Sequence, residues 1–314
     1  MMRPRVTTRS RAAIGRRWIA VLLVAVFVTA GVRAAIPTAE LRPLFTLSEG
    51  LALPSDVAVG RDGRIYVVDS GNHRIAVFEQ GGKRLFTFGS HGTGPAQLRD
   101  PVGIGLDPSG RVYVADKGNH RIQIFAADGT HVRALAVKAG GKNVAPVDVA
   151  VDAAGKTVYV TGNNNHKVMA FSLDGSLLLQ WGGEGINRGM FRYPATIAVG
   201  GDGRVYVVDV LNTRVQVRAP DGIIYTVGEW GVLPGQLFRP KGVALDQRGR
   251  VYVSDSYLDV VQVFNSAYQF LHVLGSGGKP QALTSAAGIA VDSDNRLYVA
   301  EMLKHRVTVF ELPP

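Results

Sequence analysis

The stretch Gly110-Arg-Val-Tyr-Val-Ala-Asp-Lys-Gly-Asn-His-Arg-Ile-Gln-Ile-Phe125 decides the fold of this chain. It predicts two short strands, Arg111–Ala115 and Arg121–Phe125, because β-branched and aromatic residues favour a pleated, packed surface. The Lys-Gly-Asn-His segment between them predicts a polar loop. The pattern occurs six times, with its tyrosine at positions 66, 113, 159, 206, 252 and 298. A period of 46 or 47 residues with several short strands per unit is typical of a β-propeller with one blade per repeat.

Each repeat predicts four strands, which in the first repeat are Asp56–Val59, Ile65–Val68, Arg74–Phe78 and Arg84–Phe88. The sixth repeat ends after its third strand, whereas Leu41–Leu47 precedes the first repeat and resembles a fourth strand. Pairing the two would remove an exposed sheet edge. We therefore predict an all-β fold: a six-bladed β-propeller of four-stranded antiparallel blades, closed by the N-terminal strand completing the last blade.

The N-terminal segment has the composition of a signal peptide. Residues 1–34 contain seven of the 35 Lys and Arg and no acidic residue, so the remaining 28 basic residues face 25 acidic ones. An apolar run, Trp18–Val32, follows the arginines and leads to the small residues of Val32-Arg-Ala34. Its 15 residues are fewer than the roughly 20 that span a bilayer. We predict a signal peptide at 1–34 and a propeller at 35–314, joined by a short linker at Ile36–Ala39. The alternative is an uncleaved membrane anchor.

These features predict a periplasmic or secreted protein, or one anchored to the membrane and facing outward. The chain has no cysteine, which excludes disulfides, thiolate metal sites and cysteine nucleophiles. The nearly neutral body disfavours nucleic-acid binding, which depends on attraction to phosphates.

The repeat resembles that of the NHL-repeat propellers. The resemblance rests on Gln97-Leu98, Pro101-Val-Gly-Ile, Val112-Tyr-Val-Ala-Asp116 and Asn119-His-Arg-Ile-Gln-Ile-Phe125, and it extends over about residues 41–314. It implies a six-bladed disk. Members of the family bind proteins or RNA, form sensor domains of bacterial receptor kinases, or carry an amidating-lyase active site, so the resemblance does not fix the function.

Two recurring features are interpreted as structural. Asp69 and Arg74, with their equivalents in other blades, can form an ion pair across the loop. The loop histidines occupy equivalent positions in different blades, where packed sheets lie about 10 Å apart. Zinc–nitrogen bonds are about 2 Å long, so these side chains are poorly placed to share one ion. We assign no catalytic residue, no metal ligand and no cofactor, and leave open a metal ion in the central channel. The loop histidines are His73, His120, His166 and His305.

Departures from the repeat provide the candidate ligand-binding residues. Asp56 and Asp148 stand at the start of an inner strand, where other blades have Gly or Thr. They could bind a cation or an amine at the channel mouth, or cap backbone amides. Trp230 lies in a crossing between blades and either binds ligand or packs under its own loop. Aromatic side chains beside cationic ones are typical of binding hot spots. The full candidate set is Asp56, Asp148, Arg188, Trp230, Lys241 and Tyr257.

The sequence thus predicts an exported binding or scaffold propeller. Its ligand would be a protein, peptide or glycan held on the loops over blades three to five. The alternative is a propeller enzyme, of the lyase or lactonase type, with a metal in the central channel. Contact with a membrane is expected only through an uncleaved N-terminal segment.

Overall fold

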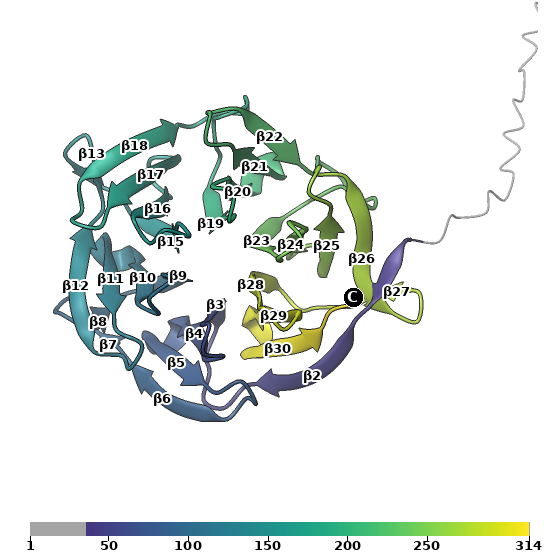
Figure 1. The fold of residues 1–314 in the computed structure, drawn as a ribbon, viewed down its shortest axis with the longest axis horizontal. Coiled ribbons are helices and arrows are strands. Elements are labelled where there is room, and N and C mark those ends of the chain that lie inside the picture. The colour runs from purple at the N-terminus through teal and green to yellow at the C-terminus, as the bar shows by residue number, and fades with distance from the viewer. Residues whose placement is uncertain (1–35, 314) are drawn as a thin grey trace, which may run out of the picture. The chain divides into compact units, whose positions relative to one another are not determined.

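A computed structural model describes residues 36–313, which form a ring of six four-stranded antiparallel sheets (Figure 1). Blade one is β3 (Pro54–Val59), β4 (Ile65–Asp69), β5 (Arg74–Phe78) and β6 (Arg84–Phe88). Blade two is β9 (Pro101–Leu106), β10 (Val112–Asp116), β11 (Arg121–Phe125) and β12 (His131–Ala136). Blade three is β15 (Pro146–Val151), β16 (Thr157–Gly162), β17 (Lys167–Ser172) and β18 (Leu177–Gly182).

Blade four is β19 (Pro194–Val199), β20 (Val205–Asp209), β21 (Arg214–Arg218) and β22 (Ile224–Val227). Blade five is β23 (Pro240–Leu245), β24 (Val251–Asp255), β25 (Val260–Phe264) and β26 (Phe270–Ser276). Blade six is β28 (Ala286–Val291), β29 (Arg296–Glu301), β30 (Arg306–Glu311) and β2 (Arg42–Leu47). Short strands are β1 (Thr38–Glu40), β7 (Ser90–His91), β8 (Gln97–Leu98), β13 (Lys138–Ala139), β14 (Lys142–Asn143) and β27 (Lys279–Pro280). Single turns of 3-10 helix are η1 (Ser70–Asn72), η2 (Lys117–Asn119), η3 (Val210–Asn212) and η4 (Met302–Lys304).

The core lies between neighbouring blades rather than within one. The second and third strands of each blade are apolar on both faces, because each blade is packed between two others. One cluster joins Val67 of blade one to Tyr298 and Val309 of blade six. The repeating tyrosine of the second strand is buried in five of the six blades. The predicted all-β, six-bladed fold is confirmed.

The N-terminal end of the described chain runs along the outside of two blades. Strand β2 lies antiparallel to β30, with Leu47 opposite Val307, and so occupies the outer position of blade six. Strand β1 lies parallel to β26, with Thr38 opposite Val273. The interpretation of Ile36–Ala39 as a linker is therefore wrong, because Thr38–Glu40 adds a strand to the outer edge of the blade-five sheet. The predicted signal segment falls outside the described residues.

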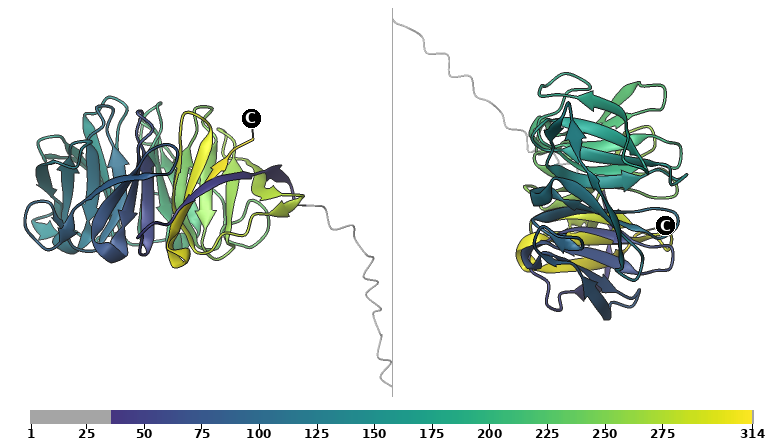
Figure 2. Two further views of the ribbon diagram at one scale, coloured as in Figure 1. Left: turned by 90° about the horizontal axis from the view of Figure 1, so that it is seen from below. Right: turned by 90° about the vertical axis from the view of Figure 1, so that its left-hand side faces the viewer.

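The disk has two different faces, seen edge-on in Figure 2. The turn face carries the tight turns that join strands one and two, and strands three and four, of each blade. The loop face carries the loops between strands two and three and the crossings between blades. No helix within residues 36–313 is long and apolar enough to cross a membrane.

Candidate functional site

A carboxylate ends the second strand in five of the six blades and holds the loop face together; in blade three the strand ends in Gly162. Asp69 accepts a hydrogen bond from Arg74 Nε at 2.7 Å and another from the backbone N–H of Ala52 at 2.7 Å. The side chain of Asn72 donates to the same carboxylate. The carboxylate therefore ties its own loop to the preceding crossing. The same ion pair joins Asp116 to Arg121, Asp209 to Arg214 and Glu301 to Arg306.

Three of the four loop histidines, His73, His166 and His305, link neighbouring blades, whereas Nδ1 of His120 has no hydrogen-bond partner among residues 36–313. Nδ1 of His305 accepts the backbone N–H of Leu53 at 3.0 Å, and Nδ1 of His166 accepts that of Tyr193 at 3.2 Å. Asp259 takes this role in blade five. These side chains point along the ring to the next blade, so they do not converge on its axis. No three His, Asp or Glu side chains among residues 36–313 are grouped so that they could hold one metal ion.

Asp56 and Asp148 lie in the wall of the central channel and bridge blades. Oδ2 of Asp56 accepts the N–H of Ile104 in blade two at 3.0 Å, and Oδ2 of Asp148 accepts the N–H of Ile197 in blade four at 2.8 Å. In each case Oδ1 accepts the N–H of the following residue in its own strand. A Cβ on Gly103 would collide with Asp148, which explains the glycine between the two carboxyl groups.

Both acids are almost completely enclosed, with 5% of Asp56 and 3% of Asp148 exposed. Burial raises the pKa of Asp56 to about 7, although hydrogen bonds from Ile104, Val57 and Asp148 oppose the shift. Burial also raises the pKa of Asp148 well above its ordinary value, and the charge of Asp56 raises it further. The two groups therefore titrate together as a pair that keeps a proton into the neutral range.

A cavity of about 530 Å³ opens at the loop-face end of the channel. Its wall includes the second residue of every inner strand, and only one of the six is charged. Asp56 and Lys241 of the predicted set line it, but Trp230, Tyr257, Arg188 and Asp148 do not. The second residues of the inner strands are Ser55, Val102, Val147, Ala195, Lys241 and Ala287. Cavity residues outside the predicted set include Arg239, Ser256, Asp259, Thr284 and Leu303.

Trp230 and Tyr257 are exposed on the loop face. Trp230 is 71% exposed, so it does not pack under its own loop; its backbone forms a bridge with Leu237. Tyr257 is 57% exposed and stacks on Phe238, with ring centroids 4.1 Å apart. Arg188 is exposed in the preceding crossing. The two aromatic residues are therefore available to a ligand.

Other exposed apolar side chains accompany them on the loops of blades three to six. We call this set the apolar half-face: Ile186, Tyr193, Leu211, Trp230, Val232, Leu233, Tyr257 and Leu303. The corresponding loops of blades one and two, at residues 48–53, 70–73, 89–100 and 117–120, expose one large apolar side chain, Leu53, and residues 137–145 and 163–166 expose none. The loop face is thus divided into a polar part and an apolar part.

A model of the NHL repeat matches residues 51–78 and 98–125. Together with six blades around a ring, this match supports an NHL-repeat propeller family. The chain carries NHL repeats and folds as a six-bladed propeller. No curated protein matches the sequence significantly.

Solved structures share the fold of this NHL propeller. A streptogramin B lyase has a TM-score of 0.63 at 15% identity, covering 87% of this chain and 97% of the other. A virginiamycin B lyase from Staphylococcus aureus has a TM-score of 0.57 at 15% identity, covering 82% and 80%. A gluconolactonase from Xanthomonas campestris has a TM-score of 0.65 at 18% identity, covering 89% and 97%. At these identities the likeness concerns the fold alone.

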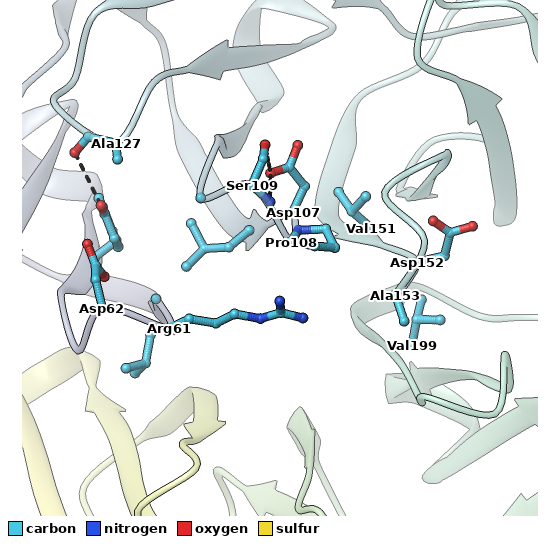
Figure 3. Close-up of a pocket in the computed structure, with 15 residues that line it drawn as sticks. Arg61, Asp62, Asp107, Pro108, Ser109, Ala127, Val151, Asp152, Ala153 and Val199 are labelled. Atoms are coloured by element: carbon cyan, nitrogen blue, oxygen red, sulfur yellow. Dashed lines mark hydrogen bonds between the residues drawn. The ribbon is translucent and has the colours of Figure 1, made fainter.

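The NHL propeller has two further cavities at the turn face, of about 400 and 620 Å³. Figure 3 shows the smaller one, into which Arg61 extends. The carboxylates there are used by their own turns: Asp107 accepts from the N–H groups of Ser109 and Arg111, and Asp246 from that of Arg250. These acids stabilise the tight turns, so the loop-face cavity and the apolar half-face are the stronger candidate site.

Proposed function

We propose that this protein is an exported binding propeller that holds a peptide segment of a partner protein on its loop face. The observation that carries the proposal is the apolar half-face, which gathers eight large apolar side chains on the loops of blades three to six. Single exposed apolar residues are ordinary, but contiguous ones mark interaction sites. Leu303 belongs to this surface and also lines the channel cavity, so the two features adjoin.

The side chains favour a peptide over a glycan as the occupant. Five of the eight are aliphatic, and aliphatic side chains suit the apolar side chains of a peptide better than the hydroxyl groups of a sugar. The charges around them favour an acidic peptide, because four basic residues outnumber the exposed acids Glu184 and Glu229 of the same crossings. Arg188, Arg192, Arg239 and Lys241 lie on the same loops and inner strand, and none forms an ion pair within residues 36–313. An apolar segment carrying carboxylates would complement both properties.

Selection from a random peptide library on the immobilised protein tests this function. We expect apolar, acidic peptides that bind the wild type and lose more than about 1 kcal/mol of affinity when Trp230 or Tyr257 is changed to alanine. Leu178→Ala is the matched control, because Leu178 is 59% exposed but lies on the outer strand β18, away from the loop face. A selection that yields no such peptides, or equal losses in the control, would contradict the proposal.

Catalysis in the channel is a second candidate function, favoured by Asp56. A carboxyl group whose pKa is raised to about 7 in a cavity wall suits general acid–base chemistry. The names of the lyases and the gluconolactonase suggest the substrates to try, a streptogramin B and a gluconolactone. Turnover that Asp56→Asn abolishes would support this function. Turnover that survives this change, or none with either substrate, would count against it.

A further inference from the structure

The ring formed at the channel mouth by the second residues of the six inner strands contains one charged side chain. The second residue of each inner strand faces the cavity, and in five blades it is Ser, Val or Ala. Blade five has Lys241 instead. Its backbone is fixed, because its carbonyl accepts the hydroxyl of Thr196 in blade four at 2.7 Å. The same bond from hydroxyl to carbonyl joins Ser55 to Val102. The fold thus needs only the backbone at this position, and the lysine side chain is not required for the contact.

Arg239 stands beside Lys241 at the same mouth. The backbone of Arg239 is held on both sides: its N–H donates to Asp255 and its carbonyl accepts the N–H of Ser256 at 3.0 Å. Neither cationic side chain forms an ion pair or a side-chain hydrogen bond with any residue from 36 to 313. Burial, with the nearby charge of Arg239, lowers the pKa of Lys241. Two cations are therefore placed together without a counter-charge.

The acids of the cavity do not supply that charge. Oδ1 of Asp259 accepts the N–H of Ser285 at 3.1 Å, as part of the link between blades five and six. Asp56 uses both oxygens to accept backbone N–H groups, and its raised pKa favours the neutral form. The hydroxyl groups of Ser256 and Thr196 also lie in the cavity wall, where they donate to the backbone carbonyls of Arg239 and Lys241 respectively. A carboxylate entering the cavity would meet the two cations.

We propose that Arg239 and Lys241 form a carboxylate-binding subsite at the mouth of the channel, which anchors the acidic end or side chain of the bound peptide. This inference rests on the proposed peptide-binding function and adds the direction in which the bound peptide lies. The apolar part of the peptide lies on the half-face, and its carboxylate enters the cavity beside Leu303. Charge-assisted hydrogen bonds to the half-buried Lys241 and the exposed Arg239 favour this arrangement.

Three synthetic peptides test the subsite: acetyl-Leu-Leu-Asp amide, acetyl-Leu-Leu-Leu with a free carboxyl end, and acetyl-Leu-Leu-Asn amide. Calorimetric titration at fixed ionic strength compares them. We expect at least one charged peptide to bind about tenfold or more tightly than the neutral one, which corresponds to about 1.4 kcal/mol. The first two peptides differ in the source of the carboxylate. Comparison of their affinities therefore shows whether the subsite prefers a side-chain carboxylate or the carboxyl end of the chain.

Substitutions of Lys241 and Arg239 test whether these two residues cause the preference for charged peptides. Lys241→Met and Arg239→Met should each remove most of the preference for charge, while Lys117→Met, a cation of the loop face in blade two outside the cavity, should keep it. Equal binding of charged and neutral peptides to the wild type, or a preference that survives both changes together, would overturn the subsite. If Trp230→Ala weakens all three peptides while the two cation variants change nothing, the peptide-binding function stands and the subsite alone is wrong.

A second measurement needs no substitution in the protein tested. Reductive ¹³C-methylation keeps the lysine charge and gives each lysine an NMR signal, and Lys241→Arg identifies that of Lys241. Acetyl-Leu-Leu-Asp amide should raise the lowered pKa of Lys241, because a bound carboxylate stabilises the ammonium form. The neutral peptide should not. An unchanged titration of Lys241 in the presence of the charged peptide would overturn the proposal.

Discussion

The acid pair in the channel wall gives a quantitative prediction about stability and pH. Burial raises the pKa of Asp56 from 3.8 to about 7 in the folded protein, whereas the unfolded chain has the ordinary value. The folded state therefore holds its proton to higher pH than the unfolded state. The stability that this proton contributes is fully present below about pH 3.8 and is lost as the pH rises to about 7. A shift of about three pKa units corresponds to about 4 kcal/mol over this window.

Replacing Asp56 by asparagine removes the ionisation and leaves one oxygen to accept hydrogen bonds. One of the two N–H groups now bound to the carboxylate, of Val57 or Ile104, loses its acceptor. The loss costs about 1–2 kcal/mol at any pH. We expect Asp56→Asn to be less stable than the wild type at pH 4 and more stable at pH 8. The difference between the two should change by about 4 kcal/mol, because the wild type must bury the charge of Asp56 at high pH in addition to that of Asp148, whereas the variant retains Asp148 alone.

Urea unfolding followed by circular dichroism between pH 4 and pH 8 measures this difference. Glu301→Gln is the matched control. Burial alone would raise the pKa of Glu301, but hydrogen bonds from Arg306, Thr308 and the N–H of Thr284 lower it. The stability that ionised Glu301 contributes is therefore present above the pKa of this group in the unfolded chain and is lost as the pH falls. The stability difference between the wild type and Glu301→Gln should accordingly become smaller in acid. A pH-independent difference for Asp56→Asn, or one with the sign of the control, would refute the account of the acid pair.

Three further predictions follow from the contacts described. Removing residues 36–48 should lower the melting temperature by several degrees, because Leu41 and Leu47 are buried in two inter-blade clusters; an unchanged value would mean that the ring closes without them. His73→Ala should leave peptide affinity unchanged and cost at most about 1 kcal/mol of stability, since its Nδ1 makes one weak bond to the N–H of Asp100; lost binding would show that this histidine contacts the ligand. Intact-mass analysis of the exported protein should find a chain starting near Ala35, and a full-length, membrane-bound species would favour the anchor instead.

The repeat was sufficient to predict the fold because the same packing problem recurs at each interface between blades. A strand between two blades must be apolar on both faces, so Val112–Asp116 and its equivalents form continuous runs, and the tyrosine returns with each one. The predicted first-repeat strands match β3 to β6 to within two residues at each end. The pairing of Thr38–Glu40 with β26 could not be predicted, because three residues are too few to show a periodic pattern of apolar residues and their partners lie more than 230 positions away.

The candidate site was only partly predictable. Departures from the repeat identified Asp56 and Lys241, which the structure brings into one cavity. The sequence could not show that the oxygens of Asp56 accept N–H groups from its own strand and from blade two, because such bonds depend on the relative positions of neighbouring blades in the fold. Arg239 and Ser256 were missed as cavity residues, although one signal was available. Most inner strands begin with proline, and the residues on either side of that proline line the mouth in blade five.

The ring supplies a criterion for separating function from architecture. A contact that recurs at several interfaces, such as the carboxylate with its arginine, is explained by the need to join blades. Departure from the repeat is not enough by itself, because Asp259 replaces a histidine and still binds the N–H of the next blade. Lys241 and Trp230 meet a stricter condition: each departs from the repeat, and within residues 36–313 neither side chain is engaged in a hydrogen bond or ion pair. Symmetry explains the backbone of both residues and the side chain of neither, so we place the ligand where those two side chains point.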